Sequence, residues 1–171
     1  GVLEAVTVGH DGLAAEVISL NGEHAMVQIY DETGGLRPGE PVHGSGQPLS
    51  VTLAPGLIGE TFDGIQRPLE VVRDAQGLYL RRGADARLPD RAWAFTPVAA
   101  EGDEVRGGEV LGHVPETPSI EHRVLVPPGR TGTITYLAPA SELHHEDVVA
   151  RIRDAAGEEH EVRLATRWPV R

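Results

Sequence analysis

The sequence contains no lysine and no cysteine among its 171 residues, so all 15 of its basic residues are arginine. A phosphate-binding loop of the G-x-x-x-x-G-K-[ST] type needs its lysine at the β- and γ-phosphates, and this chain cannot hold one. Schiff-base chemistry and attachment of biotin or lipoate to a lysine are excluded for the same reason. The absence of cysteine excludes disulfides, thiol nucleophiles and thiolate metal sites, so the fold must be stabilised by packing.

Aromatic residues and long apolar runs are also scarce. Aromatic side chains make up 4% of the sequence and hydrophobic residues 40%, so we expect a core of valine, leucine, isoleucine and alanine. No run approaches the roughly 18 apolar residues that cross a bilayer, and we expect no direct membrane insertion. The net charge of −11 disfavours nucleic acid as a partner, because an acidic protein repels phosphate backbones.

Glycine and proline, with 21 and 13 residues, divide the sequence into short segments that are typical of a β-rich chain. Asn21-Gly22 lies between the runs 13–20 and 23–30. Asn-Gly favours positive φ at both central positions of a type I′ turn, which predicts a β-hairpin. Further strands are predicted over 2–8, 36–42 and 49–53. Several short strands so close together indicate a small barrel.

The second half of the chain shows the same β pattern after a short helical linker. Pro68 is suited to the first turn of a helix that would end at Gly77, and 85–91 is predicted to be a surface loop. Strands are predicted within 101–114, 124–126, 132–137, 148–152 and 161–166. The expected fold class is therefore mainly β, with two β modules.

The densest group of potential metal ligands is Leu143-His144-His145-Glu146-Asp147. Adjacent histidines point to different sides of one element, and the His-x-x-x-His spacing is missing, so a charged surface turn is favoured over a metal site. The run Glu158-Glu159-His160-Glu161 is likewise interpreted as solvated charge.

Serine chemistry has equally little support. Ser141, His144 and Asp147 are near in sequence, but a catalytic triad also needs its three groups and an oxyanion hole brought together in space. Gly44-Ser45-Gly46 only approaches the G-x-S-x-G nucleophile elbow. We therefore assign no catalytic, cofactor-binding or metal-binding residue in this chain.

Glycine pairs at 34–35 and 107–108 do not fit a dinucleotide-binding G-x-G-x-x-G loop and are predicted to be tight turns. The pattern Gly102-Asp103-Glu104-Val105, followed by Gly107-Gly108 and Gly132-Thr133-Ile134, resembles half of a biotinyl/lipoyl hammerhead module. That family carries its cofactor on a lysine at a hairpin tip, and the corresponding hairpin at 115–122 has none. The shape can be shared without the carrier function.

A more specific resemblance covers essentially the whole chain. The stretch Gln28-Ile29-Tyr30-Asp31-Glu32-Thr33-Gly34-Gly35-Leu36-Arg37-Pro38-Gly39-Glu40 resembles the N-terminal part of the catalytic A subunit of V-type and archaeal-type rotary ATPases. The resemblance continues through Phe62-Asp63-Gly64-Ile65-Gln66-Arg67-Pro68-Leu69, Trp93-Ala94-Phe95-Thr96-Pro97 and Leu125-Val126-Pro127-Pro128 to Trp168-Pro169-Val170-Arg171. The Asp63–Leu69 stretch is the most characteristic of this family.

The resemblance implies an order of parts. Residues 1–66 would form the N-terminal β-barrel without the family's first strand, so that the barrel would be either open or completed by a neighbouring molecule. Residues 67–89 would be a linker at the edge of an absent nucleotide-binding domain. Residues 90–165 would form the bulge, or non-homologous insertion, with a barrel-sandwich or hammerhead-like fold. Residues 166–171 would begin the return to the absent nucleotide-binding domain.

The resemblance also implies a role. The parent subunit would hydrolyse or make ATP with Mg²⁺, coupled to proton or sodium transport, in a hexamer of alternating A and B subunits on the cytoplasmic face of the membrane. This segment, without a phosphate loop, would be inactive and would serve hexamer assembly and contact with peripheral-stalk subunits, through exposed leucine and valine patches. On its own it would be prone to self-association. The alternative is a free-standing hammerhead-like binding module without the attachment lysine.

Overall fold

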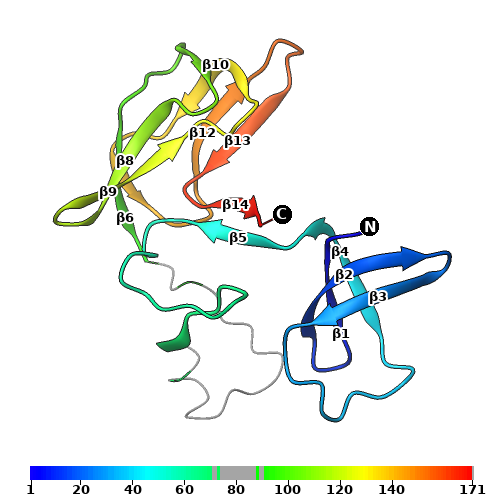
Figure 1. The fold of residues 1–171 in the computed structure, drawn as a ribbon. Coiled ribbons are helices and arrows are strands. Elements are labelled where there is room, and N and C mark those ends of the chain that lie inside the picture. Colours follow the sequence, from blue (N-terminus) through cyan, green and yellow to red (C-terminus); the bar gives the residue numbers. More distant parts are fainter. Residues whose placement is uncertain (71–72, 74–87, 89–90, 171) are drawn as a thin grey trace. The chain divides into compact units, whose positions relative to one another are not determined.

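The structure, a computed structural model, describes residues 1–70, 73, 88 and 91–170 (Figure 1). They belong to two units. Unit 1 comprises Gly1–Thr52, Thr61–Leu88 and Arg167–Arg171, and unit 2 comprises Leu53–Glu60 and Pro89–Thr166. The chain therefore passes from one unit to the other four times.

Unit 1 is built around a four-stranded sheet. Its strands are β1 (Glu4–Val8), β2 (Leu13–Asn21), β3 (His24–Ile29) and β4 (Val42–Pro48), in the order β3-β2-β1-β4. β1 pairs antiparallel with both β2 and β4. A small aliphatic core lies against this sheet; its buried members are Val6, Val8, Leu13, Ala15 and Val17.

The predicted hairpin at Asn21-Gly22 is confirmed, but its turn differs from the expected type. Asn21 pairs with His24, which leaves Gly22 and Glu23 as the two loop residues. Gly22 has a φ of 60°, whereas neither Asn21 nor Glu23 has a positive φ. Positive φ at the first loop residue alone belongs to a type II′ turn, which needs glycine at that place, so the type I′ prediction is wrong.

The predicted strand at 36–42 is wrong over most of its length. β4 begins at Val42, and 36–41 contains no strand, because Pro38 and Pro41 have no amide hydrogen to donate to a ladder. No strand pairing in the described part of the chain joins β3 to β4, so the sheet is open there. A separate two-stranded sheet pairs β5 (Ser50–Leu53) with β14 (Thr166–Pro169).

Unit 2 contains two four-stranded sheets, which confirms the expected second β module. The first sheet has the order β11-β6-β8-β9 and the second the order β13-β12-β10-β7. The bounds are β6 (Trp93–Pro97), β7 (Glu104–Arg106), β8 (Val110–Thr117), β9 (Ile120–Leu125), β10 (Thr131–Leu137), β11 (Ser141–Leu143), β12 (Val148–Arg153) and β13 (Glu159–Arg163).

Both sheets of unit 2 contribute to one apolar core. Trp93 and Phe95 from β6 are buried with aliphatic side chains such as Leu111, Ile134 and Ile152. Gly112 is required beside Phe95, because a Cβ at this position would overlap the Phe95 ring and lie 2.7 Å from the Thr96 carbonyl oxygen. The core is larger and contains bulkier side chains than that of unit 1.

The predicted helical linker is only partly described. Leu69, Glu70 and Arg73 are helical, which agrees with a helix start after Pro68, and the rest of 68–77 lies outside the described residues. Most of the surface loop predicted at 85–91 also lies outside them. Among the described residues, no helix has the length and apolar character needed to span a membrane.

Candidate functional site

The Asp63-Gly64-Ile65-Gln66-Arg67 stretch forms a tight turn in unit 1. The Asp63 Oδ1 atom accepts hydrogen bonds from the amides of Ile65, at 3.1 Å, and Arg67, at 2.8 Å. Gln66 has a φ of 64°, which is uncommon for a residue with a side chain. This geometry directs the Gln66 and Arg67 side chains to different neighbours.

The two side chains connect this turn to other elements of unit 1. Gln66 accepts a hydrogen bond from the Thr52 amide at 2.5 Å and donates one to the Thr52 carbonyl at 2.7 Å, so it pairs with β5 as a strand would. Arg67 binds Asp63 Oδ2 at 2.6 Å and Asp31 Oδ1 at 2.8 Å. Asp31 in turn accepts from the Ala14 amide on β2 at 3.3 Å.

The hydrogen bonds and charges of this turn favour the ionised forms of Asp63 and Arg67. Burial raises the pKa of Asp63, but hydrogen bonds from the Arg67 amide and guanidinium and from the Ile65 amide outweigh it, and the pKa is lowered overall. Burial lowers the pKa of Arg67, and its bonds to Asp63 and Asp31 raise it overall. The Asp31–Arg67–Asp63 network is thus a structural clamp that joins three segments of unit 1.

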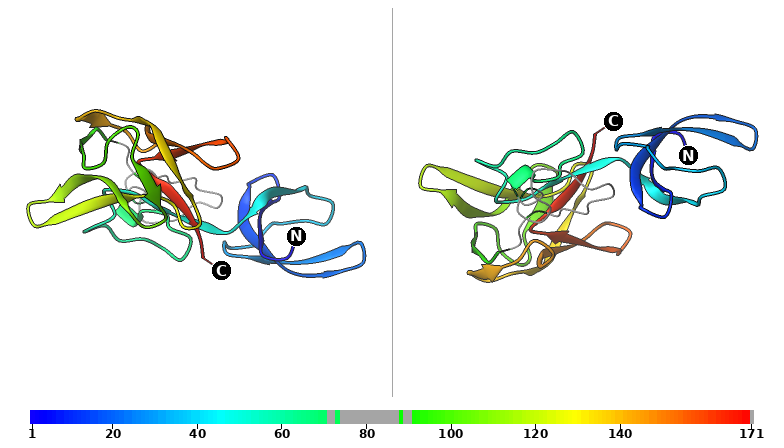
Figure 2. Two further views of the ribbon diagram at one scale, coloured as in Figure 1. Left: turned by 90° about the horizontal axis from the view of Figure 1, so that it is seen from above. Right: turned by 90° about the horizontal axis from the view of Figure 1, so that it is seen from below.

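The turn end of the β2–β3 hairpin forms an apolar arm, defined here as residues 18–26. β1 pairs with β2 as far as Glu16, and the Leu3 amide bonds to the Val17 carbonyl, so β2 beyond that point pairs with β3. Both views of Figure 2 show the hairpin extending away from β1. Ile18, Leu20 and Met26 are 39%, 52% and 62% exposed. Because Met26 pairs with Ser19 and Leu20 with Ala25, Leu20 and Met26 lie on opposite faces of the hairpin, and each face of the arm exposes an apolar side chain.

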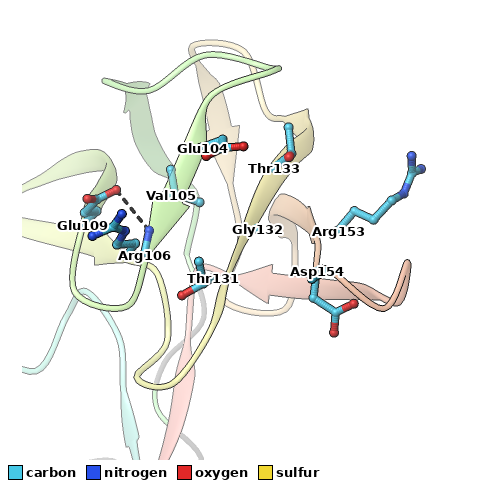
Figure 3. Close-up of a pocket in the computed structure, with 10 residues that line it drawn as sticks. Glu104, Val105, Arg106, Glu109, Thr131, Gly132, Thr133, Arg153 and Asp154 are labelled. Carbon is cyan, nitrogen blue, oxygen red and sulfur yellow. Dashed lines mark hydrogen bonds between the residues drawn. The ribbon is translucent and has the colours of Figure 1, made fainter.

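A hollow of about 510 Å³ lies in unit 2 beside β7, β10 and the end of β12 (Figure 3). Charges of both signs line it: Glu104, Glu109 and Asp154 against Arg106 and Arg153. The Arg153 side chain points away from the other lining residues in Figure 3 and binds Glu159 at 2.8 Å. The lining groups do not converge on one point, and we assign no ligand to the hollow.

Gly132, which lines this hollow, lies where β10 comes very close to the end of β12. A Cβ at Gly132 would overlap the Arg153 carbonyl group and lie 3.1 Å from the Asp154 Cα atom. Glycine is therefore required for β10 and β12 to approach each other there.

The predicted turn at Gly107-Gly108 is confirmed. Gly108 has a φ of 90°, and the Glu109 amide donates a hydrogen bond to the Arg106 carbonyl oxygen at 3.0 Å.

Within 143–147, the prediction of a charged surface turn is wrong for one residue. His145 is 7% exposed, its Nε2 donates to the Pro55 carbonyl oxygen at 3.0 Å, and its ring stacks on Trp93. The other groups stabilise the local backbone, because Ser141 Oγ donates to the Pro139 carbonyl and Asp147 accepts from the His144 amide. The structure does not assemble them as a triad.

A cluster of possible metal ligands does lie in the 158–161 region, but it includes a residue that the sequence reasoning missed. One ligand atom each from Asp154, Glu158 and His160 lies within 4.8 Å of the others. The Asp154 carboxylate already accepts from the amides of Ala156 and Glu158, and its other oxygen lies 2.8 Å from His160 Nε2. These bonds lower the pKa of Asp154. They also show that the cluster stabilises the turn that connects β12 to β13.

The glycine-containing segments do not fit a nucleotide either. Gly34-Gly35 lies in a turn, with a φ of 92° at Gly35, and Gly44-Ser45-Gly46 lies in β4, where Ser45 Oγ donates to the Gln47 carbonyl. No described helix follows any of these segments, whereas a phosphate loop leads into one. These segments therefore lack the loop-to-helix geometry of a phosphate-binding loop.

Sequence reasoning also gave Glu116 no role. It lies on β8 and accepts the amides of Gly56 at 2.7 Å and Ile58 at 2.9 Å. Asp31 and Gln66 were quoted only as parts of a family motif, without a role. Pairing across tens of residues leaves no local signal, although the unusual Asp-Gly-Ile-Gln-Arg-Pro string could have identified the turn.

Two family descriptions match the chain. The barrel-sandwich domain of the ATP synthase alpha/beta subunit matches residues 86–171, and the beta-barrel domain of the ATP synthase alpha/beta family matches residues 1–46. Individual relatives are similar over 170 residues, or 98% of this chain. They include the A subunit of the A-type ATP synthase from Thermococcus onnurineus (strain NA1), at 50% identity, Methanopyrus kandleri, at 49%, and Pyrococcus abyssi, at 48%.

The match covers a limited part of each relative. The chain spans 29% of the Thermococcus and Methanopyrus proteins and 17% of the Pyrococcus protein. The barrel-sandwich match covers the two sheets of unit 2, and the beta-barrel match covers most of the open sheet of unit 1. The family matches agree with the fold. The chain therefore belongs to the ATP synthase alpha/beta subunit family and corresponds to a segment of the A subunit of the A-type enzymes.

Proposed function

We propose that this chain provides assembly contacts, rather than catalytic groups, within a rotary ATP synthase. The relatives that it matches are A subunits of A-type ATP synthases. In the complete protein, ATP and Mg²⁺ would bind outside these 171 residues, since the chain has no lysine for a phosphate loop. The complex would couple ATP synthesis or hydrolysis to proton or sodium movement, with this subunit peripheral on the cytoplasmic face of the membrane.

The apolar arm of unit 1 is the observation that supports an assembly role. Ile18 and Leu20 on β2 and Met26 on β3 are exposed on a hairpin end that its own sheet does not cover. Burial of such side chains against a neighbouring A or B subunit would contribute about 25 cal/mol per Å² of apolar surface. Unit 2 would contact the peripheral stalk. The same arm would make the isolated chain prone to self-association.

Hexamer assembly tests this proposal directly. The full-length A subunit carrying this segment, with Leu20→Gln and Met26→Gln together, should form hexamers with the B subunit only at several-fold higher protein concentration, as measured by native mass spectrometry. Ile120→Gln, which changes a similarly exposed apolar residue in unit 2, is the matched control and should assemble normally. Unchanged assembly of the double variant would contradict the proposal.

A further inference from the structure

The end of the β2–β3 hairpin carries a pair of residues that can react with each other. Asn21 is the single asparagine of the sequence, and Gly22 follows it directly. Asn21 is exposed, is the last residue of β2 and pairs with His24. The side-chain amide carbon of an asparagine and the amide nitrogen of the next residue can close a five-membered ring. A glycine in the second position offers no side chain to obstruct that closure.

The two groups that would react are not held by other bonds. In the described part of the chain, no hydrogen bond engages the Asn21 side chain or the Gly22 amide. A Cβ placed at Gly22 would meet no atom within 4 Å, so the space around the turn is open. Ring closure therefore breaks no hydrogen bond of the reacting groups and displaces no neighbouring side chain.

The ladder around Asn21 has two strands and no third. Among the described strands, β1 pairs with β2 as far as Glu16, and beyond Val17 β2 pairs with β3 alone. A two-stranded ladder is marginally stable by itself, and its end opens at little cost in free energy. The main-chain rotation that brings the Asn21 side chain to the Gly22 nitrogen is therefore not opposed by a neighbouring strand.

Asp63-Gly64 provides a contrast within the same unit, since an aspartate before a glycine can close the same ring. Here the side chain is held on both oxygens: Asp63 Oδ1 accepts from the amides of Ile65 and Arg67, and Oδ2 binds the Arg67 guanidinium at 2.6 Å. These bonds must break before the carboxyl carbon can turn to the Gly64 nitrogen. The fold therefore protects the Asp63 site and leaves the Asn21 site unprotected.

We propose that Asn21 is a site of spontaneous deamidation in the folded protein, with water as the co-reactant. The Gly22 nitrogen bonds to Asn21 Cγ, the Cγ–Nδ2 bond breaks, and ammonia leaves with the proton of the Gly22 amide. Water then adds through its oxygen to one of the two ring carbonyl carbons. The bond from that carbon to the Gly22 nitrogen breaks, and the nitrogen regains a proton. Opening at Cγ gives aspartate, and opening at the main-chain carbonyl carbon gives isoaspartate.

Both products change the apolar arm. Each places a carboxylate directly after Leu20, which is exposed in the arm. Isoaspartate also routes the main chain through its Cβ atom, and the added methylene group disturbs the pairing with His24 at the end of the ladder. The modification is independent of the proposed role in assembly, because it needs only the hairpin and water.

Ageing of the whole chain at neutral pH, both folded and in concentrated urea, tests the site. Peptide mapping by mass spectrometry follows the loss of Asn21 and the formation of isoaspartate at positions 21 and 63. The folded chain should lose Asn21 at a rate within about tenfold of the rate in urea. Isoaspartate at Asp63 should form about a hundredfold or more slowly in the folded chain than in urea, because at least two charge-assisted hydrogen bonds must first break.

Asn21→Gln is the matched control. It keeps a side-chain amide in the same turn but would need a larger ring, so it should accumulate no isoaspartate at position 21. Loss of Asn21 that is detectable only in urea would overturn the proposal. Equal slowing of the Asn21 and Asp63 reactions by folding would overturn it as well, since the hairpin end would then be as protected as the clamp.

Discussion

In unit 2 the rings of Trp93 and Phe95 are buried among aliphatic side chains from both sheets, whereas the core cluster of unit 1 consists of valine, leucine and alanine. Unit 1 instead contains an ionic network, Asp31–Arg67–Asp63, and this network connects separate segments of the unit. The comparison teaches that two β units of one chain can be stabilised by different forces. Each should therefore respond to different substitutions.

The largest effect is expected from Phe95→Ala. Removing a ring that is 1% exposed should lower the free energy of unfolding of unit 2 by about 3–5 kcal/mol, because the cavity left behind adds to the lost burial. Chemical denaturation followed by NMR signals from each unit measures this, with Val98→Ala, at an exposed site, as the control. An equal loss in both units would show that they unfold together and would break the comparison.

Arg67→Ala should have the next largest effect, this time in unit 1. The substitution leaves Asp31 and Asp63 without their cation at a site where the arginine side chain is 14% exposed. We expect a loss of about 2–3 kcal/mol, somewhat below the value for a fully buried pair. Arg37→Ala, an exposed arginine of the same unit, should change stability by less than about 0.5 kcal/mol in the same denaturation experiment. A similar loss for both variants would contradict the clamp.

Gly22→Ala should destabilise the hairpin of unit 1 by about 1 kcal/mol, because alanine resists the positive φ of this turn. No atom lies within 4 Å of the added Cβ, so the cost is one of backbone conformation. Gly64→Ala also meets no neighbour and lies outside the positive-φ region, and it should leave stability nearly unchanged. Thermal unfolding of the two variants compares them directly, and equal shifts in Tm would refute the conformational explanation.

The smallest effect is a pH dependence of unit 2. Burial lowers the pKa of His122; the nearby Glu116 raises it and His145 lowers it further, with a net decrease. In the unfolded chain the pKa of this histidine is about 6.5, so below that pH the unfolded state binds a proton that the folded state does not. The stability of unit 2 should therefore decrease as the pH falls from about 6.5 toward the lowered pKa. Above about pH 6.5 this histidine should make no further change to stability.

Unfolding midpoints of unit 2 at pH 7.5 and 5.5 measure this decrease, and His122→Gln should remove most of it. The clamp in unit 1 should respond at lower pH. The pKa of Asp63 is depressed, so its contribution is present above the ordinary aspartate pKa of about 3.9 and is lost as the pH falls below it. A drop in unit 1 at pH 5.5 that Asp63→Asn removes would reverse this assignment.

Sequence reasoning identified the β class, the hairpin at Gly22 and the family, because short apolar runs, turn residues and the Asp63–Leu69 string are local signals. It failed where the outcome depends on distant partners. Nothing near His145 in the sequence shows that it is buried against Pro55, and nothing near Glu116 shows that it binds the amides of 56 and 58. The predicted domain boundaries at 66, 89 and 165 and the roles in hexamer and stalk contact stay predictions.

The pairing of β5 with β14 has a consequence for biosynthesis. A ribosome must complete all of 89–165 before the partner strand of β5 emerges, and the loop to be closed by that pairing contains an entire folding unit. Prior folding of unit 2 would shorten this loop and reduce the entropy lost on closing it. This loop therefore favours a folding order in which unit 2 is complete before the β5–β14 sheet of unit 1 forms.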